Sequence, residues 1–563
     1  MTDAGGATRS TATWVQTPGG PIWAGVEEPR SGQVRGVVVL VPSVALEGVV
    51  TWRALRRLSR ELTAEGYSVV RFSWSGDGDS RALEPHDDAV HAWHDDLRAV
   101  TRLARSLAAS GAPVVAVALR VGAALVDGVR DLFDDVVLWE PVDGRQFVRV
   151  STTLRRMHVA APLESKEIVE FCGASYPKEQ LAGLRAAVPP SDARAVWTEP
   201  DQAPLFYGIS PQNAIVPVES VHDVVREVAR DDSGWWERQP WTPVDTTTMT
   251  TADGHVVRER LVSIGRHQLP AVISEPLDGE PARRTFVFTA AGAEPRFAPS
   301  RVWVDGAREV AALGCAAVRA DRRGLGEAWE PVSDRAPLVY SERVVEDVED
   351  ILDWAARTWP APVVAGGSCV GSWALMLGNR TPLASQLLLF EPQAWCEDPT
   401  LYVQHESGNT YFRRAPVARG LRADTFGETR RYRIVIKSLL TRLRPTVIAM
   451  QTFITTHVPE SVWERLARAN LVEYPYLPLV KTDPATQTEL HFDHRDWDGF
   501  VRSRGQQSLE RLHAQGRSVT ATLSDALDHS IYSLGARRYV IGVLKRAAQE
   551  QPKDYSAERR RAS

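Results

Sequence analysis

The sequence predicts an α/β fold built as two tandem domains, each a mostly parallel, doubly wound sheet. The chain has 563 residues, and single hydrophobic cores stop growing near about 250–300 residues. Short apolar runs alternate with amphipathic helical patterns, which is typical of βαβ units. The same order of elements occurs twice, about 250 residues apart, which is far too long a period for a solenoid and therefore indicates a duplicated domain.

The first domain is expected over residues 17–245 and begins with the apolar run "RGVVVLVPS" (35–43). A continuous apolar run is typical of a parallel strand buried on both faces. An amphipathic helix, a second strand and the turn "SGDGDS" (75–80) follow it, and a helix with an acidic start comes next. The domain continues with the strand, turn and helix "PVVAVALRVGAAL" and the strand "DDVVLWEPV".

The second domain is expected over residues 246–552 and repeats this order from the strand "RTFVFTAAG" (284–292). Its counterpart turn is "RRGLGEA" (322–328), and its strand, turn and helix read "PVVAGGSCVGSWAL". The boundary falls in "SGWWERQPWTPVDTTTMTTADGH" (233–255), where the hydrophobic periodicity lapses. The tryptophans there are expected to pack either between the domains or onto their own domain.

Composition excludes several classes of protein. Hydrophobic residues make up 44% of the chain, charged residues 24%, and the net charge of −5 indicates no nucleic-acid partner. The polar ends, residues 1–16 and 553–563, are expected to be disordered tails. The N-terminus lacks the apolar core of a signal peptide, and no run approaches the ~20 apolar residues of a membrane helix.

Cysteine usage indicates a reducing compartment, and we therefore expect a cytoplasmic protein. The cysteines are far apart and form neither a CxxC pair nor a metal-binding spacing. We accordingly predict no disulfide framework, no metal and no cofactor. The four positions are Cys172, Cys315, Cys369 and Cys396.

The turn at Cys369 is the candidate catalytic position. A nucleophile on a tight strand-to-helix turn needs small residues two positions before and after it, because strand and helix nearly touch there. Gly367 and Gly371 meet this need around Cys369, whereas Ser368 as nucleophile would place the β-branched Val370 at the crowded position. Cys369 is therefore preferred over Ser368, and a buried, inert thiol is the non-catalytic alternative.

The matching position of the first domain holds Arg120, between Ala118 and Gly122. A guanidinium group stays protonated and cannot attack a carbonyl carbon. The first domain is therefore expected to be catalytically silent. We expect Arg120 to form a structural ion pair, and anion binding is the alternative.

These motifs resemble those of the α/β-hydrolase superfamily. The second half is similar to the first type of bacterial hydrolases found with exosortase systems, whose elbow reads Gly-x-Cys-x-Gly, through "FTAAGAEPRFAPSRVWVDGAREVAALG", "VRADRRGLGEA", "GGSCVGSWAL" and "DALDHSIYS". The first half resembles the second type through "VVVLVPS", "YSVVRFSWSGDGDS", "IVEFCGASYPKEQL" and "WWERQPW", but departs at the elbow. The resemblance implies two tandem α/β-hydrolase domains and a hydrolase reaction.

A helical cap is expected at about residues 393–475, in the slot that hydrolases use to shape the substrate pocket. This stretch is rich in arginine and helical in pattern. Cys396 and His405 within it are expected to be packing residues.

The catalytic histidine is expected in a loop after the last strand, because the chain order in this fold is nucleophile, acid, histidine. A strand at 518–524, a loop and a helix surround His529, which we predict to be the base. In the first half His222 lies in the helical pattern "VPVESVHDVVREVA" and is expected to be structural.

The acid is expected after the preceding strand, in "TELHFDHRDWDGF". Asp496 is preferred, and Asp493 and Asp498 remain alternatives. His491 and His494 lie beside these aspartates, but their spacing matches no zinc pattern.

The loop "AAGAEPRFAPSR" (290–301) follows the first core strand of the second domain and is the expected source of an oxyanion donor. Gly292 and Ala293 are the candidates there, and the N–H of Val370 at the start of the elbow helix is the other donor.

Two arginines flank this loop, and Arg296 and Arg301 are the candidates for binding an anionic substrate or carrier. Salt bridges to Asp305 or Glu294 are the alternative, and the residues by themselves favour it.

Together these residues predict hydrolysis of an ester or thioester through a Cys-His-Asp triad and an acyl-enzyme. The expected partner is a small-molecule acyl ester or thioester, free or carrier-linked. Acyl transfer at the same site and a non-catalytic scaffold of two degenerate domains are the alternatives. The sequence does not determine the oligomeric state.

Overall fold

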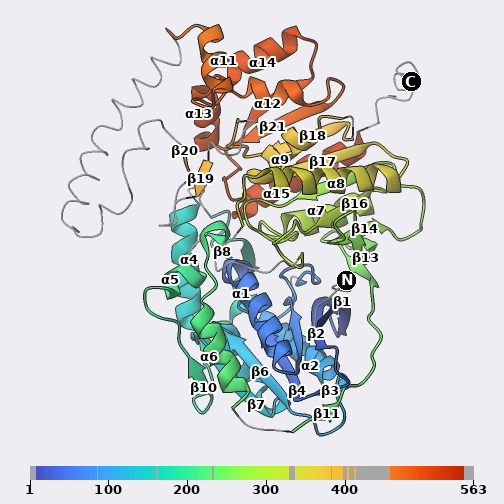
Figure 1. Cartoon of the computed structure of the whole chain (residues 1–563), viewed down its shortest axis with the longest axis vertical. Coiled ribbons are helices and arrows are strands. Elements are labelled where there is room, and N and C mark those ends of the chain that lie inside the picture. Colours follow the sequence, from blue (N-terminus) through green and yellow to red (C-terminus); the bar gives the residue numbers. More distant parts are fainter. Residues whose placement is uncertain are drawn as a thin grey trace, which may run out of the picture.

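The protein consists of two lobes, each built on its own large sheet (Figure 1). We call residues up to 245 the first lobe, drawn blue to green in Figure 1, and the rest the second lobe, drawn from light green to red above it. The structure is a computed structural model and describes residues 8–84, 86–159, 163–208, 210–230, 234–328, 337–381, 383–396, 402–404, 411–413 and 457–550.

The first lobe contains a seven-stranded sheet in the order β1-β2-β5-β4-β6-β7-β10. β1 and β2 form an antiparallel hairpin at one edge, β2 also runs antiparallel to β5, and the remaining pairs are parallel. The strands are β1 (Thr8–Thr17), β2 (Gly20–Pro29), β4 (Gly36–Val41), β5 (Tyr67–Phe72), β6 (Val114–Leu119), β7 (Asp135–Trp139) and β10 (Arg194–Val196).

The second lobe contains a nine-stranded sheet in the order β12-β13-β14-β16-β15-β17-β18-β21-β22. Its first pairs, up to β14 with β16, are antiparallel, and the others are parallel. The strands are β12 (Thr246–Thr250), β13 (Val256–Ile264), β14 (Leu269–Pro276), β15 (Thr285–Thr289), β16 (Ala316–Ala320), β17 (Val363–Ser368), β18 (Gln386–Phe390), β21 (Gln487–Phe492) and β22 (Val519–Leu523).

The two sheets have the same strand order over their shared part. β1-β2-β5-β4-β6-β7-β10 corresponds, strand by strand, to β13-β14-β16-β15-β17-β18-β21. β22 has no counterpart in the first sheet among the described residues. The predicted α/β fold with two mostly parallel sheets is therefore confirmed. Within the described residues, the first lobe has no counterpart of β22, the strand that precedes the loop of His529.

Helices cover both faces of each sheet, as parallel sheets require (Figure 1). The first lobe has α1 (Ala45–Ala64), α2 (Ala89–Ser106), α3 (Gly122–Asp127), α4 (Gly144–His158), α5 (Ala203–Tyr207) and α6 (Val218–Val228). The second lobe has α7 (Val302–Ala312), α8 (Glu342–Thr358), α9 (Val370–Gly378), α11 (Glu460–Arg468), α12 (Tyr476–Lys481), α13 (His494–Arg502), α14 (Gly505–Ala514) and α15 (Leu534–Gln549). No helix in these described ranges combines the length and apolar character that a bilayer crossing requires.

Small elements complete the described structure. Two-stranded pairs are formed by β3 (Gln33–Val34) with β11 (Trp236–Glu237), β8 (Ile168–Phe171) with β9 (Ala174–Pro177), and β19 (Tyr402–Gln404) with β20 (Tyr411–Arg413). Short 3₁₀ turns lie at Arg130–Leu132, Glu179–Leu181, Leu184–Ala186 and Pro211–Asn213. Most of the expected cap at 393–475, with His405, and the expected tail at 553–563 lie outside the described residues.

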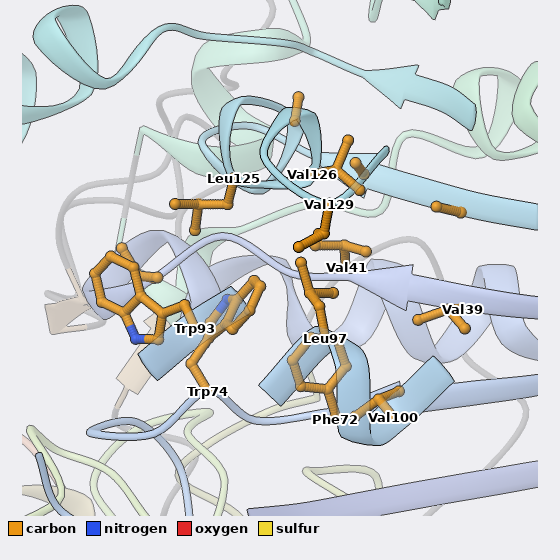
Figure 2. Packing of buried hydrophobic residues seen from close by; sticks show 14 of the residues in the cluster. Val39, Val41, Phe72, Trp74, Trp93, Leu97, Val100, Leu125, Val126 and Val129 are labelled. Atoms are coloured by element: carbon orange, nitrogen blue, oxygen red, sulfur yellow. The ribbon is translucent and has the colours of Figure 1, made fainter. Parts of the chain in front are cut away.

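The core of the first lobe lies between its sheet and α2. Leu97 of α2 points toward Val41 of β4 (Figure 2), and Trp93 and Val100 of α2 belong to the same buried cluster as Val39 and Val41. The spacing of the apolar residues along α2 brings them onto one helix face. Burial of such side chains stabilises the fold by about 1.5–3 kcal/mol each.

The structure corrects the expectation for the N-terminal tail and decides where the tryptophans of the domain boundary pack. Residues 8–16, expected in a disordered tail, belong to β1, because Trp14 and Val15 are apolar enough to be buried and the strand pairs along its full length with β2. Among the boundary tryptophans, Trp236 and Trp241 pack against the core of the first lobe and Trp235 is exposed. These tryptophans therefore pack on their own lobe.

Each lobe inserts one turn into a ring of arginines on the other lobe. In the turn at 75–80, Asp79 pairs with Arg296 at 2.9 Å and with Arg319 at 3.2 Å. In the turn at 322–328, Glu327 pairs with Arg56 at 2.6 Å and with Arg71 at 2.8 Å. These charged side chains are almost completely removed from solvent. The two lobes are thus joined by buried ion pairs.

Candidate active site

Cys369 occupies the sharp turn between β17 and α9. Its backbone angles are φ 50° and ψ −111°, a conformation that costs energy for a residue with a Cβ. Its N–H donates a hydrogen bond of 2.9 Å to the carbonyl oxygen of Phe390 at the end of β18. Ser368 is the last residue of β17 and is buried. The strained position therefore belongs to Cys369 and not to Ser368.

The glycines on both sides of Cys369 allow this turn to form. A Cβ on Gly367 would lie 2.7 Å from the backbone carbon of Gly371. A Cβ on Gly371 would lie 2.6 Å from the carbonyl oxygen of Thr289 at the end of β15. Both distances are shorter than real Cβ contacts, so strand and helix approach too closely for any side chain. The crowding expected from the sequence is present at both flanks.

His529 lies in the loop between β22 and α15 and pairs with Asp496. Its Nδ1 is 2.5 Å from Oδ2 of Asp496, whose Oδ1 accepts a hydrogen bond of 2.9 Å from Nε2 of Gln393. The side chain of His529 is 26% exposed, whereas that of Asp496 is 5% exposed. The imidazole thus reaches solvent at one end and is held by a buried carboxylate at the other.

Electrostatics tie His529 to both expected partners. Burial by itself lowers the pKa of His529, but the charge of Asp496 and the charge and hydrogen bonding of Cys369 raise it well above its usual value. Burial raises the pKa of Asp496, and the His529 charge and the hydrogen bonds from His529 and Gln393 more than offset this, so that it falls below its usual value. Cys369, His529 and Asp496 therefore form one interacting group.

The two other candidate acids, Asp493 and Asp498, have different surroundings. Asp493 caps α13, because its side chain accepts a hydrogen bond of 2.7 Å from the N–H of Asp496. Asp498 lies further along α13 and is exposed. Asp496 lies in the first turn of α13, which directs its carboxylate at His529.

The expected oxyanion loop is held by an arginine that sequence reasoning missed. Nη2 of Arg322 donates hydrogen bonds to the carbonyl oxygens of Ala290 at 3.2 Å and Gly292 at 2.7 Å. These carbonyl groups are therefore turned toward Arg322. Val370, the other expected donor, is the first residue of α9, where backbone N–H groups lack intrahelical partners.

Glu294 in the same loop is a second residue whose importance sequence reasoning missed. Its carboxyl group is buried, and burial raises its pKa to about 8 despite the charges of Arg322 and His529. Glu294 is therefore mostly protonated at neutral pH. The only sequence signal was an acidic residue in an otherwise small and apolar loop.

The expectation that Arg296 and Arg301 bind substrate is not met by their positions. Arg296 is buried between Asp79 and Asp321. Arg301 donates to the carbonyl oxygens of Gly78 at 2.9 Å and Ser80 at 2.8 Å, and it pairs with Asp305. Both arginines thus hold the turn at 75–80 of the first lobe, which the sequence could not reveal because the partners are more than 200 positions away.

The first-lobe counterpart of the elbow carries no nucleophile. Arg120 has φ 55°, and its N–H donates to the carbonyl oxygen of Trp139, as Cys369 does to Phe390. Its guanidinium pairs with Glu47 at 3.1 Å and stacks on Tyr207 at 3.7 Å. The predicted structural ion pair is confirmed. His222 lies in α6, in the helical position expected for it.

The other histidines near the acid do not reach this group. His491 stacks on Phe390 and its Nδ1 lies 3.1 Å from the hydroxyl group of Tyr539. His494 is exposed and pairs with Asp525.

One group of side chains in the described part of the chain has a spacing that could hold a metal. Ligand atoms of Glu391, Asp496 and His529 lie within 4.8 Å of one another. The short hydrogen bond between Asp496 and His529 already uses the facing atoms of these two side chains. The absence of a metal stays a prediction.

The first lobe forms one wall of the site. A Cβ on Gly292 would lie 3.1 Å from Oε1 of Gln212 of the first lobe. Two small cavities of about 50 and about 20 Å³ lie between the lobes beside the His529 loop. Their shared lining residues are Ala45, Leu46, Cys172 and Tyr532.

Comparisons with known proteins find solved structures that are similar to about half of this chain. No protein-family model matches the chain, and no curated protein sequence matches it. A dienelactone hydrolase from Anabaena variabilis is 13% identical, with 52% of this chain and 97% of that chain covered and a TM-score of 0.32. A putative dienelactone hydrolase from Klebsiella pneumoniae is 12% identical (53% and 100% covered, TM-score 0.32), and an esterase from Pyrobaculum calidifontis is 13% identical (52% and 85% covered, TM-score 0.29).

Proposed function

We propose that this chain is a tandem α/β-hydrolase, with domains at residues 17–245 and 246–552, that cleaves esters or thioesters in its second domain. Cys369 is the nucleophile, His529 the base and Asp496 the acid that orients it. The observation that carries the proposal is the strained elbow at Cys369 together with the 2.5 Å pair of His529 and Asp496. The residues of the elbow are also those that resemble the exosortase-associated hydrolases.

The reaction begins when the Cys369 sulfur attacks the carbonyl carbon and its proton passes to His529. The N–H of Val370 and those of Gly292 and Ala293 stabilise the negative oxygen of the tetrahedral intermediate. His529 then gives its proton to the leaving alcohol or thiol, and a thioester with Cys369 remains. Water attacks this thioester, loses a proton to His529, and releases the carboxylic acid and the free thiol.

The first domain is proposed to act as the wall and support of this site, without chemistry of its own. Its elbow residue Arg120 is neutralised by Glu47 and covered by Tyr207. A charged side chain held in this way neither attacks a carbonyl nor offers a free binding site for an anion.

The proposal is tested with Cys369→Ala and a panel of acyl p-nitrophenyl esters and acyl thioesters of increasing length. We expect a loss of kcat/KM of at least about a thousandfold, as for removal of other nucleophiles. Cys315→Ala is the matched control, because Cys315 is completely buried and burial raises the pKa of its thiol. Full turnover by Cys369→Ala would disprove the assignment.

The silent role of the first domain is tested with the double variant Arg120→Leu/Glu47→Leu. Removing both partners avoids leaving one buried charge without its counterpart. Turnover within about twofold of the unmodified protein is expected. A large loss of kcat in a folded double variant would instead place chemistry in the first domain.

A further inference from the structure

Glu391 is a buried carboxyl group beside the candidate triad that the proposed mechanism does not use. It follows β18 directly, has φ 48°, and is inaccessible to solvent. Its Oε2 accepts a hydrogen bond of 3.0 Å from the N–H of Asp493, the residue that follows β21. Glu391 thus fastens the end of one strand to the end of the next.

The first lobe, which we call the silent lobe because its elbow carries Arg120, contains a matching glutamate. Glu140 follows β7, has φ 51°, and accepts a hydrogen bond of 2.5 Å from the N–H of Thr198, two residues after β10. Its second oxygen accepts a hydrogen bond of 3.2 Å from the hydroxyl group of Tyr207. The fastening of the two strands is therefore common to both lobes, and only the environment of the second oxygen differs.

In the second lobe the carboxyl group of Glu391 lies beside the triad. Oε1 is buried and receives no hydrogen bond from a donor in the described ranges. Oxygen atoms of Glu391 and Asp496 and a nitrogen of His529 lie within 4.8 Å of one another. A proton on the Glu391 carboxyl group would add a donor for Asp496, which already accepts from Gln393 and His529.

Two carboxyl groups this close share one negative charge between them. The charge settles on Asp496, because His529 and Gln393 bind its oxygens. Burial and the charges of Asp496 and Asp493 raise the pKa of Glu391 to about 10. The titratable groups around Glu391 are Asp493 and Asp496 at the start of α13, His529 in the loop after β22, and Tyr539 on α15.

We propose that Glu391 is a positioning residue that stays protonated and donates its carboxyl proton to Asp496. This inference rests on the proposed function, since it concerns the same triad. Asp496 then has three donors, Gln393, His529 and Glu391, which hold its carboxylate in one orientation toward the imidazole. In the silent lobe, Tyr207 fills the corresponding place and no such role exists.

The decisive variant is Glu391→Gln, because glutamine keeps an oxygen for the Asp493 N–H and always carries N–H donors. We expect kcat/KM within about threefold of the unmodified protein and an unchanged acid limb of its pH profile. If Glu391 were charged, its removal from beside His529 would move the acid limb down by about two pH units. Such a shift would overturn the proposal.

Glu391→Leu tests whether Glu391 donates a proton to Asp496 or only links the ends of β18 and β21. Glu140→Leu is its matched control in the silent lobe. Both variants lose the fastening hydrogen bond and are expected to lose similar stability. Only Glu391→Leu is expected to lower kcat, by about ten- to a hundredfold, with KM changed less than about threefold. Equal kcat in the two variants would reduce Glu391 to a structural role and overturn the proposal.

Alkylation of Cys369 by iodoacetamide provides a readout that needs no ester substrate. Its rate as a function of pH is expected to coincide for the unmodified protein and Glu391→Gln and to fall in Glu391→Leu. If the unmodified protein reacts at Cys369 but cleaves no ester or thioester, the proposed function fails while the alkylation profiles still decide the role of Glu391.

Discussion

Single residues near the candidate triad are distinguished by burial rather than by type. Asp493, Asp496 and Asp498 lie within six positions, yet one caps a helix, one binds His529 and one faces solvent. The difference arises because α13 begins at His494 and turns Asp496 toward the loop of His529. The aspartate that the sequence favours, Asp496, is the one that pairs with His529, and the residue at which the helix starts decides between the three.

Glu294 leads to a prediction about pH and stability. Its pKa in the folded protein is about 8, above the usual 4.5, so the folded state holds a proton that the unfolded chain has lost. The stabilisation by this proton is complete below about pH 4.5 and is lost as pH rises through about 8. Glu294→Gln should therefore gain stability relative to the unmodified protein when the pH is raised from 5 to 9. The difference in free energy of unfolding between the two proteins should change by on the order of 1–4 kcal/mol.

Urea unfolding at both pH values measures this difference. Glu280→Gln, at an exposed position, is the control and should show no such dependence. A pH-independent difference between Glu294→Gln and the unmodified protein would contradict the protonated state of Glu294.

At the scale of elements, the strand, turn and helix around Cys369 are determined by local crowding. The β-run, the two glycines and the apolar helix are all contiguous in sequence, so the elbow could be predicted without knowing its neighbours. The sequence did not predict that the first sheet, in the part of the chain that the structure describes, ends at β10 without a counterpart of β22. This difference appears only when the edges of the two sheets are compared.

The elbow predicts a sharp difference between two glycines. Gly371→Ala would place a Cβ 2.6 Å from the carbonyl oxygen of Thr289 at the end of β15 and 2.9 Å from that of Ala290, the first residue of the oxyanion loop. We expect a loss of about 1–3 kcal/mol in stability, or more, and a large loss of kcat. Thermal unfolding and turnover of the purified variant measure the two effects.

Gly542→Ala in α15 is the matched control, since a Cβ there would meet no atom within 4 Å. Alanine in an exposed helix interior should stabilise the protein by about 0.5–1 kcal/mol. Unchanged turnover of Gly371→Ala would show that α9 and β15 are not in close contact at the site.

At the scale of the whole molecule, the lobes meet as the subunits of a two-fold symmetric dimer do. Arg71 of β5 binds Glu327 of the opposite turn, and Arg319 of β16 binds Asp79 of the opposite turn. Since β5 corresponds to β16 and the turn at 75–80 to that at 322–328, each contact occurs twice with the lobes exchanged. Such reciprocal contacts characterise isologous interfaces.

This interface predicts that the lobes unfold together. Asp79→Asn or Glu327→Gln leaves buried arginines without full compensation, and each should cost about 3–5 kcal/mol. Burial opposes ionisation of Glu327, but Arg56 and Arg71 hold its pKa below the usual 4.5, so its stabilisation is present above about pH 4.5 and fades as pH falls below it.

Calorimetry should record one transition that moves as a whole in both variants. Asp353→Asn removes an exposed pair with Arg357 and should cost less than about 1 kcal/mol. Two transitions, of which a variant moves only one, would show that the lobes are independent.

The sequence by itself determined the repeated order of strands and helices and the glycine-flanked turn at Cys369. These follow from apolar periodicity, glycine spacing and chain order, which are properties of neighbouring residues. Tertiary structure alone decided that Arg296 and Arg301 serve the interface, that Trp14 lies in a strand, and that Glu391 faces Asp496. The physical reason is that burial and charge pairing depend on partners far away in the chain, and only the packing of the two sheets brings those partners together.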